Sequence, residues 1–265
     1  MTIKLPKIGL GTWQLKNKKC QDSVLKALEI GYRLVDTAQM YGNEEQVGNA
    51  LSEGTVPRNE IFLATKLFVN DLSPKKVAKK TLESLSRLKT EYLDLLYIHW
   101  PAGKYNPKKT LSAFETLVDE GKIKHIGISN FTPKLIDEAL QVMKKPIFAN
   151  QVENHPLLKQ VPLRQYLKEK EIKLVSYSPL ARGNVRGVPE LEEIAKNHNT
   201  NPFQVSIAWE ISKGAIPIPK ASSEGHLRNN FDAQFLTLDA EEIQKVDSIQ
   251  TETRFLNPPF IRPKW

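Results

Sequence analysis

The chain has 265 residues, 40% hydrophobic and 26% charged, so it can bury one large core. No run of about 18 apolar residues is present, so we expect no membrane-spanning segment, no secretory leader and a cytoplasmic location. The single cysteine, Cys20, fits a reducing compartment. The net charge of +8 raises the question of nucleic-acid binding, but the lysines are scattered without an aromatic stripe, so we expect a solvated surface.

Eight short apolar runs are typical of buried strands. They occupy residues 7–13, 33–38, 61–67, 93–100, 125–131, 148–154, 173–180 and 215–222. Helical patterns lie between them: one opens at Ser73 with Pro74 as its first helical residue, and another covers 110–121 and closes at Gly121. After the last strand, Asp239 opens an expected extra helix, and the tail at 257–265 is too short for a long lid.

Strand and helix alternate along the whole chain in about eight units of about 33 residues, without a linker or a low-complexity tract. This pattern predicts an α/β fold of one domain, residues 1–265, in the form of a closed (β/α)8 TIM barrel. The competing architecture is an open doubly wound sheet with a dinucleotide fingerprint, which "GLGTWQ" resembles only superficially. The fingerprint fails at Gln14, where a small residue is needed, so Gly9 and Gly11 are expected to shape a first barrel strand.

Four polar groups fall where the active site of such a barrel lies, at the carboxyl ends of the strands. Asp36, Lys66 and His99 end apolar runs, and Tyr41 follows the second run directly. A buried lysine needs a partner, and Asp36 is the expected one. Held near the phenol, the lysine would lower the pKa of Tyr41 and make it a better proton donor at neutral pH, while His99 would bind a substrate oxygen. Each group alone could be an ordinary strand-end residue, but the four together fit carbonyl reduction.

The sequence resembles the aldo-keto reductases over essentially its whole length. The resemblance implies a nicotinamide cofactor bound without a Rossmann domain, a small-molecule carbonyl substrate and a monomer. It also implies that Asp36, Tyr41, Lys66 and His99 form the catalytic tetrad, with Tyr41 as general acid. The motifs that carry it are "GLGTW" (9–13), "DTAQMYGNE" (36–44), "ATK" (64–66), "YIHWP" (97–101), "GISNF" (127–131), "NQVENHP" (150–156), "YSPL" (177–180) and "IPIPK" (216–220).

The same resemblance implies which residues bind the cofactor. Ser129, Asn130 and Gln151 match positions that hydrogen-bond the nicotinamide carboxamide, and Tyr177 matches the ring that stacks on the nicotinamide. An alternative for the Ser129–Asn130 pair is that it caps the helix beginning near residue 132. Two further positions match contacts to the phosphates and ribose of the cofactor, namely Ser178 and Leu180.

Lys220 matches the position that binds the 2′-phosphate of NADP, so we expect NADPH to be preferred, with NADH possible. The expected contacts at this end of the cofactor are completed by Ser222, His226, Arg228 and Asn230. The sequence departs from the family pattern at Ala221, where a serine is common, and at His226, where an arginine is usual. Arg182 and Arg186 are candidates for contacts to the pyrophosphate, although solvated loop arginines are equally compatible with the sequence.

Trp13 and Trp100 match positions that line the substrate pocket, although core packing is an alternative for both. The short loop after the fourth strand and the short tail predict an open pocket for small aldehydes, ketoaldehydes or dicarbonyls. The histidines lack the spacing of metal ligands, so we expect no metal site. A cofactor-sensing regulatory subunit is the main functional alternative, and the intact tetrad argues against it.

Overall fold

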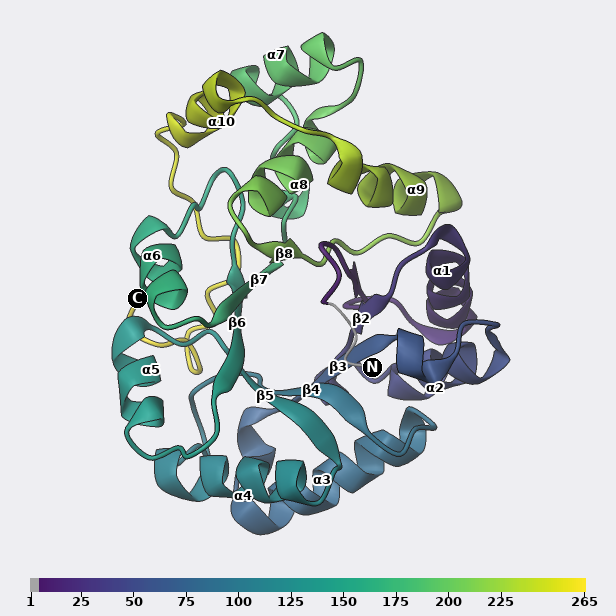
Figure 1. Ribbon diagram of the computed structural model, residues 1–265, viewed down its shortest axis with the longest axis vertical. Helices are drawn as coiled ribbons and strands as arrows, with labels where there is room; N and C mark the ends of the chain where they lie inside the picture. Colours follow the sequence, from purple (N-terminus) through teal and green to yellow (C-terminus); the bar gives the residue numbers. More distant parts are fainter. Residues whose placement is uncertain (1–4) are drawn as a thin grey trace.

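The computed structural model describes residues 5–265, and eight strands within this range form one parallel sheet in the order β1 to β8 (Figure 1). The strands are β1 (Leu10–Gly11), β2 (Leu34–Asp36), β3 (Phe62–Leu67), β4 (Leu93–Ile98), β5 (Ile123–Ser129), β6 (Ile147–Glu153), β7 (Lys173–Tyr177) and β8 (Ile216–Pro217). The N–H groups of Gly9 and Gly11 donate to the carbonyls of Pro217 and Pro219 at 3.0 and 3.2 Å, which joins the last strand to the first. The predicted (β/α)8 barrel is confirmed.

Ten α-helices surround the sheet within the described range, and in Figure 1 they lie outside the ring of strands. They are α1 (Asn17–Ile30), α2 (Glu44–Glu53), α3 (Pro74–Arg87), α4 (Pro107–Asp119), α5 (Pro133–Leu140), α6 (Val161–Glu169), α7 (Pro189–Asn197), α8 (Pro202–Ser212), α9 (Glu224–Asp232) and α10 (Ala240–Asp247). None of the helices of residues 5–265 has the length and hydrophobicity that crossing a membrane requires.

The predicted helix boundaries are confirmed in two cases and corrected in one. The helix α3 begins at Pro74 after Ser73, and α10 has Asp239 at its N-cap in a capping box with Glu242. The helix predicted from residue 110 begins earlier, at Pro107, because the Asn106 side chain accepts a hydrogen bond from the Lys109 N–H and so caps the helix there.

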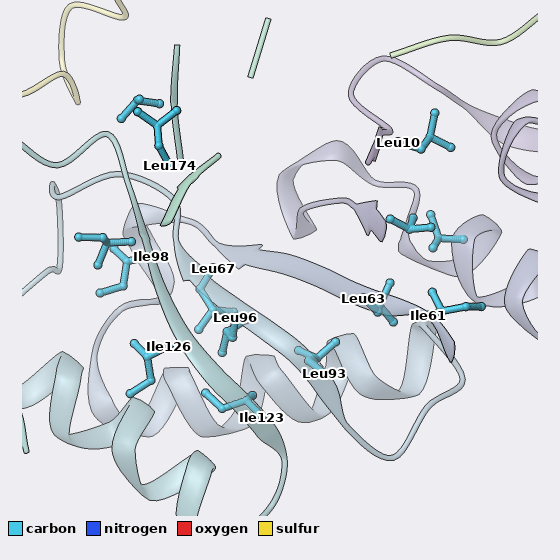
Figure 2. Close-up of a cluster of buried hydrophobic side chains, with 14 of the residues drawn as sticks. Leu10, Ile61, Leu63, Leu67, Leu93, Leu96, Ile98, Ile123, Ile126 and Leu174 are labelled. Atoms are coloured by element: carbon cyan, nitrogen blue, oxygen red, sulfur yellow. The ribbon is translucent and has the colours of Figure 1, made fainter. Parts of the chain in front are cut away.

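The alternation of side chains along each strand decides what enters the barrel. On β3, Phe62 and Ala64 belong to the cluster inside the barrel, so Lys66 points inward two residues later. The strand residues that alternate with these, such as Leu63 and Leu67, belong to the outer cluster between the strands and the helices. Figure 2 shows part of this outer cluster, in which Leu63, Leu96 and Ile126 come from three different strands. The inward positions at the carboxyl ends of β2, β3 and β4 are thus left for polar groups.

Candidate active site

The buried pair of Asp36 and Lys66 lies at the carboxyl ends of β2 and β3. The Lys66 Nζ donates to an oxygen of Asp36 and, at 2.8 Å, to the carbonyl of Thr37. The Gln151 amide donates to the other oxygen of Asp36 at 2.8 Å. Lys66 is 0% exposed and Asp36 is 2% exposed, so the pair is withdrawn from water and the predicted partnership is confirmed. Burial lowers the pKa of Lys66, and the attraction of Asp36 opposes this change.

Tyr41 is positioned by a tight turn after β2. The short 3₁₀ helix Gln39–Tyr41 ends at Gly42, whose φ of 66° lies in the left-handed region that glycine adopts without a steric penalty. The Gln39 amide donates to the Lys80 carbonyl at 2.7 Å and to Ser84 Oγ at 2.8 Å, which ties the turn to α3. The Lys66 Nζ then lies 5.2 Å from the centroid of the Tyr41 ring.

The expectation that Lys66 lowers the pKa of Tyr41 is wrong for this structure. Burial raises the pKa of the Tyr41 phenol well above its ordinary value of 10.0, and the Asp36 carboxylate and Tyr177 raise it further. The physical reason is that burial withdraws the hydration that a phenolate needs, and this is the largest effect on the phenol. Tyr41 therefore keeps its proton throughout the neutral range.

His99 follows β4 and faces Tyr41 across the site. The centroids of the Tyr41 and His99 rings are 5.9 Å apart, and the Phe68 ring lies 5.8 Å from His99 on another side. Burial, followed by the charge of Lys66, lowers the pKa of His99 well below its ordinary value of 6.5, so the imidazole is neutral. Its Nδ1 is buried and has no hydrogen-bond partner among the described residues.

The residues expected to bind the nicotinamide form one hydrogen-bonded group. Ser129 Oγ donates to the Gln151 carbonyl at 2.8 Å, and the Asn130 amide donates to the His99 carbonyl at 3.0 Å. The Tyr177 hydroxyl donates to Asn130 Oδ1 at 2.8 Å. The alternative that Ser129 and Asn130 cap the following helix is wrong, because Thr132 occupies the N-cap of α5. These side chains instead connect β5, β6 and β7 beside Asp36 and His99.

A cavity of about 640 Å³ opens above these groups. It brings together Asp36, Tyr41 and His99 with most of the residues expected to bind cofactor or substrate. Lys66 is beneath them, paired with Asp36. Lining residues expected from the sequence are Trp13, Trp100, Ser129, Asn130, Gln151, Tyr177, Ser178, Leu180, Arg182 and Lys220.

The other expected contacts do not line the cavity, and four of them belong to the segment that includes α9. Ser222 is partly buried and His226 is exposed, while the Ser223 hydroxyl accepts a hydrogen bond from the His226 N–H and caps α9. Three further residues are also outside the lining. Arg228 pairs with Glu224 at 2.8 Å, Asn230 is 3% exposed, and the Arg186 guanidinium lies 5.5 Å from the centroid of the Phe203 ring.

Several lining residues were not anticipated, and three of them come from the C-terminal tail. Leu256, Pro258 and Ile261 line the cavity, together with Met40 and Phe68. The tail, although short, therefore supplies part of the wall of the cavity, and the openness of the pocket stays a prediction. The hydrophobic residues of "FLNPPFI" were the signal in the sequence that the tail packs against the barrel, because a segment that stays in solvent is usually poor in such residues.

Three comparisons with known proteins agree with this geometry. A model of the Aldo/keto reductase family matches residues 7–251. The chain is 37% identical over 266 residues to methylglyoxal reductase DkgB of Escherichia coli O157:H7, covering 99% of this chain and 100% of that protein. It is 37% identical over 253 residues to glyoxal reductase of Bacillus subtilis (strain 168), covering 95% of this chain and 91% of that protein.

The fold is also similar to that of solved structures. One is an aldo-keto reductase enzyme from a Medee basin deep-sea metagenome library, with a TM-score of 0.94 and 37% sequence identity. The match covers 99% of this chain and 97% of that one. The barrel, the buried polar groups at its carboxyl end and the matches over nearly the full length agree with one another. The chain belongs to the Aldo/keto reductase family and is an oxidoreductase that acts on carbonyl groups.

Proposed function

We propose that this oxidoreductase is an NADPH-dependent reductase that converts small aldehydes, ketones or dicarbonyls to alcohols, with Tyr41 as the proton donor. The observation that carries the proposal is the meeting of Tyr41, neutral His99 and the buried Asp36–Lys66 pair at the base of the cavity. A reaction that adds a proton to a carbonyl oxygen needs a group that holds a proton at neutral pH and points into a pocket. Tyr41 meets both requirements.

The groups in the cavity fit a bound nicotinamide cofactor. Its volume of about 640 Å³ lies in the range of ligand pockets, and Lys220 lies at its lining with a charge suited to a phosphate. Ser129, Asn130 and Gln151 would hold the carboxamide, since their hydroxyl and amide groups offer the donors and acceptors that a carboxamide requires. Tyr177 would supply a flat apolar face for the ring. Bound NADPH would supply the hydride.

The chain's own residues account for the proton and the orientation. The raised pKa of Tyr41 keeps its hydroxyl protonated and able to donate to the carbonyl oxygen of the substrate. His99 is neutral, and the ring nitrogen that carries its proton can donate a second hydrogen bond to the same oxygen. The Asp36–Lys66 pair fixes the floor of the site with a balanced charge, so that Tyr41 is held beside His99 without a net charge beneath the substrate.

The substrate class follows from the walls of the pocket. Trp13, Trp100 and Phe68 join the tail residues Leu256 and Ile261 in a mostly apolar lining. Such a lining accepts compact carbonyl compounds without selecting one by a network of charged groups. The relatives named methylglyoxal reductase and glyoxal reductase support α-ketoaldehydes and dialdehydes as the first compounds to test.

The test is the loss of NADPH absorbance with glyoxal, methylglyoxal and a simple aliphatic ketone, for the wild type and Tyr41→Phe. We expect turnover by the wild type, and a loss of roughly 10²- to 10⁴-fold in kcat for Tyr41→Phe, the usual contribution of a general acid. The Kd for NADPH should stay unchanged because the ring remains. If the wild type binds NADPH tightly yet reduces none of the compounds, the proposal fails and a cofactor-sensing role takes its place.

A further inference from the structure

The tail that supplies part of the pocket wall is held by one buried carboxylate. Glu153 is the last residue of β6 and is 0% exposed. One of its oxygens accepts a hydrogen bond from the N–H of Phe255 at 2.8 Å, and the other accepts from the N–H of Leu256 at 2.9 Å. A carboxylate that accepts from two successive peptide groups fixes the direction of the chain as well as its position.

The surroundings of Glu153 show that it is oriented for this contact. The Nε2 of His155, itself 0% exposed, lies 3.2 Å from the same oxygen that accepts from Phe255. The carbonyl of Glu153 accepts from the Gln160 amide at 3.0 Å. A buried carboxylate is costly unless it is hydrogen-bonded, and here much of its bonding is to the tail. The position of the tail and the burial of Glu153 therefore depend on each other.

Beyond Glu153, the tail makes further contacts, one of which reaches Trp100 in the lining of the cavity. The Thr253 N–H donates to the Leu157 carbonyl at 2.7 Å, just before the Glu153 contacts. The Arg254 guanidinium lies 3.7 Å from the centroid of the Trp265 ring, and the Trp265 and Trp100 rings meet edge to face with centroids 6.5 Å apart. In Figure 1 the tail, drawn in yellow, runs from α10 past α6 beside the barrel.

We propose that Glu153 is a positioning residue for substrate: it anchors the C-terminal segment so that Leu256, Pro258 and Ile261 form the outer wall of the pocket. The inference rests on the proposed function, since the wall matters only if a carbonyl compound binds against it. A substrate large enough to reach this wall gains binding energy from it, whereas glyoxal does not reach it. Within residues 5–265, Glu153 makes no hydrogen bond to Asp36, Tyr41, Lys66 or His99, and it acts through the segment that it holds.

The experiment compares phenylglyoxal with glyoxal in Glu153→Gln. The glutamine keeps one acceptor oxygen but turns an NH₂ group toward a peptide N–H, so one of the two hydrogen bonds is lost. We expect the KM for phenylglyoxal to rise roughly tenfold, which corresponds to the loss of about one apolar side-chain contact. We expect kcat for both compounds, the KM for glyoxal and the Kd for NADPH to stay within about twofold.

Two further variants separate anchoring from a general structural effect. Glu252→Gln makes the same chemical change at an exposed carboxylate of the same segment and should behave as the wild type. Leu256→Ala removes a wall side chain but keeps its peptide N–H, so it should raise the KM for phenylglyoxal by itself. In that background Glu153→Gln should have a smaller effect than in the wild type, because both changes act on one wall.

A readout that needs no turnover is trypsin cleavage at the Arg254–Phe255 bond, followed by mass spectrometry. The bond lies directly at the anchor, so cleavage of the native protein should be about tenfold faster in Glu153→Gln than in the wild type or Glu252→Gln. Equal cleavage rates, or equal changes in KM for both compounds, would overturn the proposal. If the wild type reduces nothing, the proposed function fails and the substrate-positioning role fails with it, while the cleavage rates still decide whether Glu153 holds the segment.

Discussion

At the scale of single residues, Lys220 is the side chain on which the choice between NADPH and NADH depends most directly. It lies just after β8, is exposed, and lines the cavity at the position where the 2′-phosphate is expected. The other groups expected near that phosphate do not line the cavity, and Arg228 is engaged with Glu224. Lys220 should therefore provide most of the favourable charge at this point.

We expect Lys220→Met to raise the KM for NADPH by about 10- to 100-fold, the usual value of one hydrogen bond to a charged group. The KM for NADH should hardly change, because NADH has no 2′-phosphate. Lys196→Met, at an exposed position on α7, is the matched control. Initial rates with both cofactors at a fixed concentration of methylglyoxal measure the difference. An equal rise in KM for both cofactors would contradict the assignment.

At the scale of secondary-structure elements, α8 packs against the barrel through a buried carboxyl group. Glu210 is 0% exposed, and one of its oxygens accepts from the Asn154 amide at 3.2 Å. Its other oxygen has no partner among residues 5–265. Burial raises the pKa of Glu210 well above its ordinary value of 4.5, against the opposing effects of Ser176, Asn154 and Arg164. Burial of Glu210 between α8 and the sheet therefore favours its protonated form.

A raised folded-state pKa makes stability depend on pH in one direction. Above pH 4.5 the unfolded chain releases the Glu210 proton while the folded chain still holds it. The unfolding free energy therefore falls as the pH rises from 4.5 toward the folded-state pKa of Glu210. Relative to Glu210→Gln, the wild type should lose up to about 1.4 kcal/mol of unfolding free energy per pH unit. Urea unfolding from pH 5 to 8 measures it, with Glu91→Gln at an exposed position as control. Parallel curves for the wild type and Glu210→Gln would exclude this effect.

The strands, the helices and the residues at the strand ends could be predicted from local sequence patterns. Contacts made by segments without regular secondary structure could not. Asp36 and Lys66 were found because each ends an apolar run, and neighbouring parallel strands end at the same edge of the sheet. The contact of Glu153 with Phe255 joins residues 102 positions apart through a coil, and no period indicates it. The pKa of Tyr41 was predicted in the wrong direction because a sequence gives the neighbouring charges without the extent of burial.

At the scale of the whole molecule, the barrel is closed by the contact of its shortest strands. Both β1 and β8 have two residues, so little hydrogen bonding joins them, and a close approach of their backbones is needed. A Cβ at Gly11 would lie 2.5 Å from the Ile218 carbonyl oxygen, which belongs to the backbone and cannot rotate away. The barrel can therefore close only because Gly11 has no side chain, and the flexibility of glycine is not the reason that it is needed here.

We expect Gly11→Ala to lower the unfolding free energy by about 1–3 kcal/mol, the usual cost of overpacking a site that cannot relax. Gly225→Ala is the matched control, because a Cβ there meets nothing within 4 Å and its φ is not in the left-handed region. That substitution lies in α9 and should stabilise the protein by about 0.5–1 kcal/mol through helix propensity. Urea unfolding measures both. Gly11 also lines the cavity beside Thr12, so the substitution should disturb the closure of the barrel and the shape of the active site together. A Gly11→Ala protein as stable as the wild type would show that β1 and β8 do not need this close backbone contact.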